Sequence, residues 1–280
     1  MTIPLWVILA LLAGLGSNVI NFLSRYILKD EGDSTAWAWT FEFLRLLIFI
    51  PFAFFDFKLI LNLQSLTILI LVGLTEFVAV YLFMKMHRFT HLSISTIVSR
   101  TRLIWVPIIA FLFFGEKLKL SEYFGIAVLF LGLSIAVAPH KLFFDKGALY
   151  ANSAALMIAL NTVILKQATA FASTPIIMIF YSLPSVILFP FFMKNSKERL
   201  IHQNKDKKIP KLVGTLANVA ALYLLVAALS MGEVSKVNGL YQGMLVVSVL
   251  AGIILLKERQ DILRKLIGTA ITLIGVFLLT

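Results

Sequence analysis

The 280-residue sequence contains no cysteine and few charged residues. Without cysteine the chain has no disulfide framework, no thiolate metal site and no thiol nucleophile. Charged residues make up 14% of the chain, whereas a soluble domain has about 25%. These two shortages exclude a soluble globular protein and any chemistry that depends on a thiol.

The motifs of several enzyme classes are also missing. No glycine-rich phosphate loop followed by lysine and serine or threonine occurs, so we predict no ATP hydrolysis. The four histidines are scattered in or beside the expected loops, and no His-Glu-x-x-His motif is present, so we predict no metal site. We expect no catalytic residues and no cofactor. The first three residues carry no basic side chain, and we expect no cleaved secretory signal.

Hydrophobic residues dominate instead, at 60% of the chain with a mean hydropathy of +0.96. A bilayer cannot satisfy free backbone N–H and C=O groups, and the alternating pattern of barrel strands is absent, so the apolar segments must be helices. At about 20 residues per crossing, we predict an all-α polytopic membrane protein. Its ten transmembrane helices are expected at about 3–28, 35–55, 65–86, 92–114, 120–138, 147–169, 173–193, 211–231, 234–256 and 262–279.

The net charge of +11 lies mostly in the predicted loops. Beside a membrane, anionic lipid headgroups and the positive-inside rule explain it, so we expect the lipid bilayer and no nucleic acid as a partner. The basic run at 194–211 is interpreted in the same way, as a solvated loop. We expect an integral protein of a bacterial-type inner (plasma) membrane.

The second half of the sequence repeats the first. A shift of 142 positions aligns Tyr81 with Tyr223, Ser93 with Ser235 and Glu116 with Glu258, and after a one-residue slip Gly125 and Gly132 align with Gly268 and Gly275. We interpret this as an internal duplication. It predicts a first five-helix repeat at 1–138, a connecting loop at 139–146 and a second repeat at 147–280. An odd number of helices per repeat inverts the second copy.

Charged side chains inside the spans are costly and must be paired or face water. Glu42 and Arg45 are three residues apart and share one helical face. An internal ion pair that orients Arg45 and a direct contact with substrate both fit this pattern. Glu76 lies near mid-membrane, and its repeat position is Asn218. A polar side chain that served only local packing would not be expected at the same depth in both repeats.

The fourth span carries two arginines, Arg100 and Arg102, near its centre. On an ideal helix they point about 200° apart, so they line one cavity only if the helix is broken. The polar stripe of Arg100 returns in the ninth span at Gln242. Two equivalent stripes predict a cavity between the halves, although hydrogen bonds between packed helices explain polar stripes too.

The candidate cavity residues follow from these stripes and from isolated polar positions in other spans. Asn18 and Asn21 share a face of the first span with Arg25, which alternatively reaches the nearby interface. The candidates are Ser93, Thr96, Arg100, Glu76, Asn218, Asn238, Tyr241, Gln242, Asn18, Asn21, Asn161, Tyr81 and Tyr223. Glu42, Arg45 and Glu76 are candidates for an internal ion pair or for proton coupling.

The fifth and tenth spans lack interior charge. Their paired glycines, seven residues apart, lie on one face and permit close backbone approach. We expect both spans to be packing helices.

These residues resemble the EamA-like members of the drug/metabolite transporter superfamily over essentially the whole chain. The similarity is strongest from Trp105 and Pro107 through Gly115 and Glu116 to the glycines at 125 and 132. In the second copy Val249 replaces the proline and Lys257 the first glycine, while Glu258 stays in register. Arg45 after Phe43 and Leu44 resembles the family's second-helix arginine.

The resemblance implies a secondary transporter with inverted halves and a central cavity. We expect it to carry a small polar, anionic or zwitterionic metabolite by alternating access, as importer, exporter or exchanger, with protons or a counter-substrate as coupling partners. The resemblance implies cytoplasmic termini, but the loop charges favour termini on the outside. The alternatives are a membrane-embedded enzyme or lipid-handling protein, and a non-transporting receptor or assembly subunit. The sequence indicates neither the coupling ion nor the oligomeric state.

Overall fold

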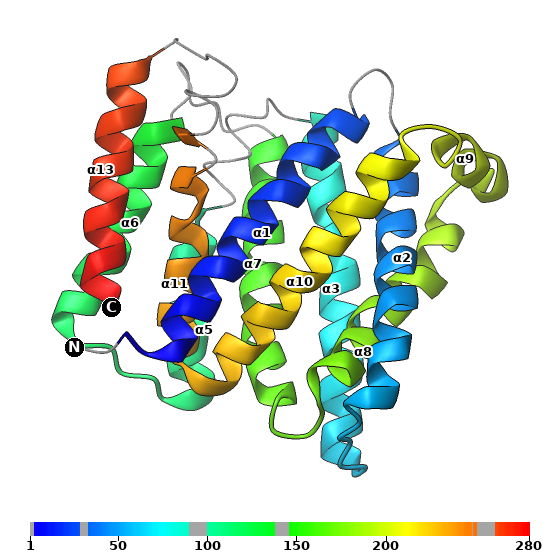
Figure 1. Ribbon diagram of the computed structural model, residues 1–280, viewed down its shortest axis with the longest axis horizontal. Helices are drawn as coiled ribbons and strands as arrows, with labels where there is room; N and C mark the ends of the chain where they lie inside the picture. Colours follow the sequence, from blue (N-terminus) through cyan, green and yellow to red (C-terminus); the bar gives the residue numbers. More distant parts are fainter. Residues whose placement is uncertain (1–2, 29–32, 90–99, 138–145, 248, 251–260) are drawn as a thin grey trace.

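A computed structural model describes residues 3–28, 33–89, 100–137, 146–247, 249–250 and 261–280. The described part consists mainly of helices, which confirms the predicted all-α class, while the number of ten transmembrane helices stays a prediction (Figure 1). The helices are α1 Leu5–Leu28, α2 Ser34–Phe55, α3 Leu63–Phe89, α5 Arg102–Phe114, α6 Leu120–Val137, α7 Lys146–Ala168, α8 Thr174–Leu188, η1 Phe189–Phe192, α9 Ser196–Gln203, α10 Lys208–Met231, α11 Val234–Gly243 and α13 Ile262–Leu279.

Six stretches of the described chain are helical, long and apolar enough to cross a membrane. They are Ser34–Phe55, Leu63–Phe83, Leu149–Ala168, Thr174–Phe192, Lys208–Met231 and Ile262–Leu279. Shorter apolar helices occupy Leu5–Val19, Arg102–Phe114 and Leu120–Ala136. The outer faces of these helices carry large exposed apolar side chains, such as Phe55 and Phe191. A lipid environment suits this surface, because apolar side chains avoid water.

Two predicted spans are interrupted rather than continuous. In the fourth, Arg100 and Thr101 form a turn and α5 begins only at Arg102. In the ninth, α11 ends at Gly243 and Met244 forms a turn before the chain is helical again at 245–247. Position 102 corresponds to position 244 in the repeat. The turn at Thr101 corresponds to position 243, one residue before the turn at Met244. Both predicted spans therefore contain a turn at nearly the same place, which the continuous ranges 92–114 and 234–256 did not anticipate.

The helix contacts follow the repeat. A shift of 142 positions superimposes α1 on α7 and α3 on α10, and the contact between α1 and α10 has its counterpart in the contact between α3 and α7. Likewise, α3 packs on α8 as α10 packs on α2. Each described α-helix thus has its most extensive contacts with the other half of the chain, and the two halves interlock.

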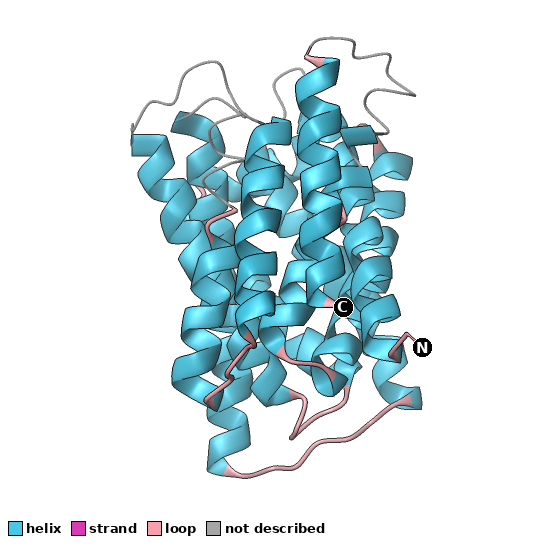
Figure 2. Cartoon of the chain, turned by 90° about the vertical axis from the view of Figure 1, so that its left-hand side faces the viewer, coloured by secondary structure: helices cyan, strands magenta, loops and turns pink. Residues whose placement is uncertain are grey.

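The two halves run in opposite directions through the molecule. In Figure 1, α1 rises from the end where both termini lie, whereas α7 descends toward that end. The side view shows the same bundle, with both termini near one end (Figure 2).

The predicted packing helices α6 and α13 lie against each other. Their glycines meet in antiparallel order, with Gly132 on Gly268 and Gly125 on Gly275. A β-carbon built on Gly132 would lie 2.4 Å from the backbone nitrogen of Thr272. No larger residue fits there without moving the backbone, as in other close membrane-helix contacts.

Candidate functional site

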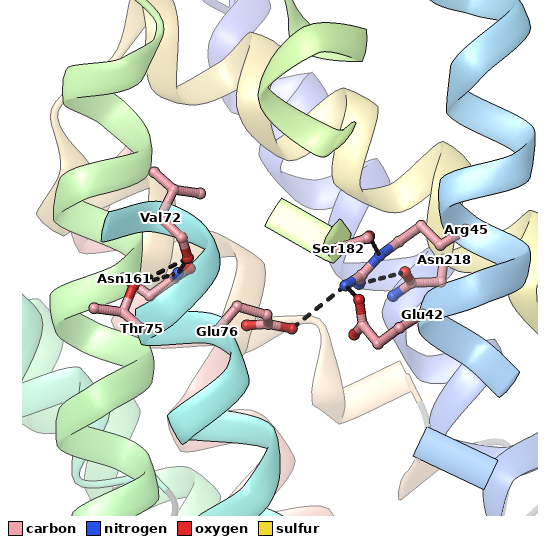
Figure 3. Close-up of polar contacts among 8 residues, drawn as sticks. All are labelled: Glu42, Arg45, Val72, Thr75, Glu76, Asn161, Ser182 and Asn218. Carbon is pink, nitrogen blue, oxygen red and sulfur yellow. Dashed lines mark hydrogen bonds and ion pairs between the residues drawn. The ribbon is translucent and has the colours of Figure 1, made fainter. Parts of the chain in front are cut away.

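A buried arginine in the middle of α2 joins four helices. Arg45 pairs with Glu42, and its Nη2 lies 3.6 Å from Oε1 of Glu76 on α3. Its Nε donates to Ser182 on α8 at 2.8 Å, and its Nη1 donates to Oδ1 of Asn218 on α10 at 3.4 Å. Figure 3 shows the guanidinium between these groups. We call these five residues the charge cluster.

The charge cluster is closed to solvent and contains one cation and two carboxylates. The side chains of Glu42, Arg45 and Glu76 are 0%, 2% and 9% exposed. The Cζ atom of Arg45 also lies 4.6 Å from the ring centroid of Tyr181 and 5.2 Å from that of Phe41, and ring faces at this distance attract a cation. The cluster therefore holds Arg45 firmly as an internal ion pair, which was one of the two predicted roles.

A second polar cluster surrounds the interruption of the fourth and ninth spans. Nη1 of Arg100 donates to Oε1 of Gln242 at 2.6 Å. The Cζ atom of Arg102 lies 5.7 Å from the ring centroid of Tyr241. Asn238 lies one turn before Gln242 on α11. We call these five residues the donor cluster.

The donor cluster contains buried donors without acceptors. Gln242 and Asn238 are 1% and 4% exposed. Within the described chain, Nε2 of Gln242, Nδ2 of Asn238 and Nε of both arginines have no hydrogen-bond partner, and no carboxylate pairs with Arg100 or Arg102. A buried donor without an acceptor costs about 1–3 kcal/mol, and more when it is charged. The cluster is therefore suited to a ligand that brings acceptor oxygens and negative charge.

The contact between Arg100 and Gln242 joins two positions that are 142 residues apart, which is the repeat shift. Two equivalent residues touch only where the axis that relates the halves passes between them. The donor cluster therefore lies at the junction of the two halves. The charge cluster repeats this feature, because Arg45 reaches both Glu76 and its equivalent Asn218.

The break in the fourth span explains how Arg100 and Arg102 can both face the same neighbouring helix. On a continuous helix Arg100 and Arg102 would point apart, but Arg100 lies in the turn and Arg102 opens α5. Both side chains then contact α11. Arg102 was not among the predicted cavity residues, and the missing signal was the break itself.

Tyr181 on α8 connects the two clusters. Its hydroxyl is hydrogen-bonded to Glu76, and its ring packs on Arg45. It also interacts electrostatically with Arg102. The two clusters are thus neighbours, although the donor cluster lines neither of the two surface hollows described, which lie at Leu120–Phe124 and beside Lys166. The predicted central cavity is not among those hollows.

A comparison with known families decides the class of this protein. The model of the EamA-like transporter family matches residues 4–138 and again residues 145–280. The chain belongs to this family. It is a membrane transporter of the drug/metabolite transporter superfamily, which supports a non-enzymatic function.

Solved structures support the fold of this EamA-like transporter. Twenty-eight chains match it, and one of them is a crystal structure of a protein with a TM-score of 0.75. The match covers 98% of this chain and 96% of that chain at 12% identity, so it shows the fold alone. A search of curated proteins gives no match.

Two other predicted residues of the transporter make helix-to-helix contacts. Nδ2 of Asn18 donates to the carbonyl of Met244 at 2.6 Å, which also accepts from the backbone nitrogen of Val247 at 3.0 Å, so α1 contacts the ninth span at its break. Asn161 on α7 donates to the carbonyl of Val72 and to the hydroxyl of Thr75 on α3, both at 2.8 Å (Figure 3). Asn161 therefore fits the packing role that membrane amides often have.

Two predicted residues, Tyr81 and Tyr223, do not join the clusters. Tyr81 packs in an aromatic group with Phe77 and Phe192. Tyr223 is 40% exposed on the apolar outer face of α10, away from Asn218. Its aromatic ring and helical depth suggested a cavity residue, but the face it occupies is the lipid-facing one. Ser93 and Thr96 lie outside the described residues, as does the side chain of Asn21.

Glu116 is a structural residue whose role the sequence did not reveal. Its Oε1 accepts from the backbone nitrogen of Val234 at 2.9 Å, and its Oε2 accepts from the hydroxyl of Ser235 at 3.0 Å. A carboxylate there stabilises the free N–H groups of the first turn of α11. Beside it, Lys236 pairs with Glu122 and Glu233, both at 2.8 Å. Across the described residues, no group of three histidine, aspartate or glutamate side chains is placed to hold a metal ion.

Proposed function

We propose that this protein is a secondary carrier that binds a small anionic or zwitterionic metabolite at the donor cluster and moves it by alternating access. The observation that carries the proposal is a pair of partly buried arginines at a helix break between the halves: their buried Nε atoms have no acceptor, and neither arginine pairs with a carboxylate among the described residues. Carboxylate and phosphate groups are the usual partners of arginine, because their oxygens match its donors. In other carriers, broken helices at the repeat interface form the substrate site.

The proposed architecture is ten transmembrane helices in two inverted five-helix repeats, at 1–138 and 147–280, joined by the loop at 139–146. The opposed directions of α1 and α7 and the exchange of equivalent contacts support it. We place the carrier in a bacterial-type inner membrane. The basic segment around α9 lies at the end opposite the termini (Figure 1), and the positive-inside rule then places the termini outside.

Binding is tested by thermal unfolding of the purified protein in detergent with a panel of compounds. Glutamate, malate and glucose 6-phosphate serve as anionic or zwitterionic probes, and glucose and uridine as uncharged ones. An anionic compound at about 100 times its dissociation constant stabilises the folded state by about 2.7 kcal/mol. We expect such a shift with at least one anionic compound and with neither uncharged one.

The site is tested with Arg100→Ala. A hydrogen bond to a charged group contributes about 1.5–3 kcal/mol, so the variant should bind about 10–100 times more weakly. The control is Lys58→Ala, which removes an exposed cation outside both clusters and should bind normally. Equal binding by Arg100→Ala and wild type would remove the donor cluster as the site.

A further inference from the structure

The charge cluster contains more carboxylates than cations in a closed environment. Arg45 is its one guanidinium, and it faces both Glu42 and Glu76. A buried carboxylate without its own counter-charge is costly inside a membrane protein. The cluster is balanced when one of the two carboxylates carries a proton.

The geometry distinguishes the two carboxylates. Glu42 lies one turn before Arg45 on the same helix, is 0% exposed and is the closer partner. Glu76 lies on a different helix, is 3.6 Å from the guanidinium and is 9% exposed. A residue on a neighbouring helix can separate from Arg45 when helices move, whereas Glu42 moves with it. Glu76 is therefore the carboxylate whose pairing can change.

The surroundings of Glu76 contain few other ionisable groups. From α2 it faces Arg45 and Glu42, and from α8 it faces Tyr181. From α10, Asn218 shares the guanidinium without a charge of its own. On α7, Asn161 bonds to α3 at Val72 and Thr75. Within the described chain, the charge of Glu76 is thus set by Arg45, Glu42 and the Tyr181 hydroxyl.

We infer that Glu76 is the proton-binding site that couples transport to a proton gradient, which rests on the proposed carrier function. A proton from the aqueous phase binds the carboxylate and leaves again on the other side of the membrane, with no other bond changed. Protonation removes the ion pair between α3 and Arg45, which also holds α8 and α10. Tyr181 links the protonation of Glu76 to the proposed substrate site, because it contacts Glu76 and interacts with Arg102.

The first test needs no substrate. Infrared difference spectra of the reconstituted protein between alkaline and acidic pH report the carbonyl stretch of protonated carboxylic acids. We expect a titrating band in wild type that Glu76→Gln removes and that Glu198→Gln retains, since Glu198 is exposed on α9. Tyr181→Phe should move the titration of this band to higher pH, because the ionised carboxylate loses a donor. A spectrum unchanged by both Glu76→Gln and Tyr181→Phe overturns the inference.

The second test separates coupling from binding. In proteoliposomes with labelled glutamate, malate or glucose 6-phosphate, wild type should accumulate a compound when an imposed pH gradient drives it. Glu76→Gln should lose this accumulation by at least about tenfold and still exchange external label for internal compound. Gradient-driven accumulation by Glu76→Gln contradicts proton coupling. Failure of wild type to move any of the three compounds contradicts the proposed function, while the infrared result still decides the proton site.

Discussion

At the scale of single residues, the structure contrasts two ways of burying an arginine. Arg45 meets Glu42, Glu76, Ser182 and Asn218. Arg100 has one hydrogen bond, to Gln242, among the described residues. Removing one partner of a buried ion pair destabilises the fold, whereas a cation inside the bundle with free donors indicates a functional site.

Replacing Arg45 tests how much the fully paired arginine contributes to stability. Arg45→Ala leaves Glu42 and Glu76 buried without a cation, and breaking a buried pair in this way costs about 3–5 kcal/mol. We expect a clear loss of stability in thermal unfolding of the purified protein. Adding Glu42→Gln and Glu76→Gln to the same variant should restore part of the loss. A triple variant as unstable as Arg45→Ala would contradict the charge argument.

The opposite result is expected at Arg100. Because Arg100→Ala removes a partly buried charge with one hydrogen bond among the described residues, the ligand-free protein should be as stable as wild type or more stable. Thermal unfolding without added compounds measures this. A large loss of stability would show that Arg100 is a structural residue and would weaken its assignment to the site.

Outside the spans, Asp33 gives a pH prediction. It accepts from the backbone of Thr35 and Ala36 at the start of α2 and pairs with Arg199 at 2.5 Å. Partial burial alone would raise the pKa of Asp33, but the hydrogen bond and charge of Arg199 and the two backbone donors hold this pKa below its ordinary value of 3.8. The folded state therefore gains stability above pH 3.8 and loses it as the pH falls through the lowered pKa.

The matched variant is Asp33→Asn, because asparagine caps a helix as well as aspartate does. It should be less stable than wild type at pH 7 by under about 1 kcal/mol, since the pair is partly exposed. The difference should shrink as the pH falls below 3.8 and through the lowered pKa of Asp33. Thermal unfolding over this pH range measures it, and a constant difference would show that the charge of Asp33 does not contribute.

At the scale of helices, small residues determine which elements approach closely. The α6–α13 pair depends on Gly132, where a side chain would meet the backbone of Thr272. Gly132→Val should destabilise the protein by about 1–3 kcal/mol through overpacking. The same new side chain at Ala127, on the exposed face of α6, should have little effect. Equal unfolding temperatures for the two variants would contradict the packing of these helices.

Much of the helical organisation could be predicted, because hydropathy and the repeat are local or regular signals. The glycine spacing indicated the α6–α13 contact, and the shift of 142 identified Glu76 with Asn218. The breaks at Thr101 and Met244 could not be predicted, since neither contains a proline and the turn at Met244 is contacted by distant Asn18. The cap of α11 by Glu116 also depends on a contact across 118 positions.

At the scale of the whole molecule, the halves interlock so that equivalent residues meet at their junction. Arg100 touches Gln242, and Arg45 reaches both Glu76 and Asn218. A movement of one half against the other must therefore alter both clusters together. This is the arrangement that an alternating-access carrier requires, because the substrate site and the coupling site change in the same step.

Uptake of labelled glutamate, malate and glucose 6-phosphate into proteoliposomes tests the central claim most directly, with wild type, Arg100→Ala and Lys58→Ala compared side by side. The account predicts uptake of at least one compound by wild type and Lys58→Ala, and a loss of at least about tenfold in Arg100→Ala, in line with the lost charged hydrogen bond. Wild-type uptake in Arg100→Ala would contradict it.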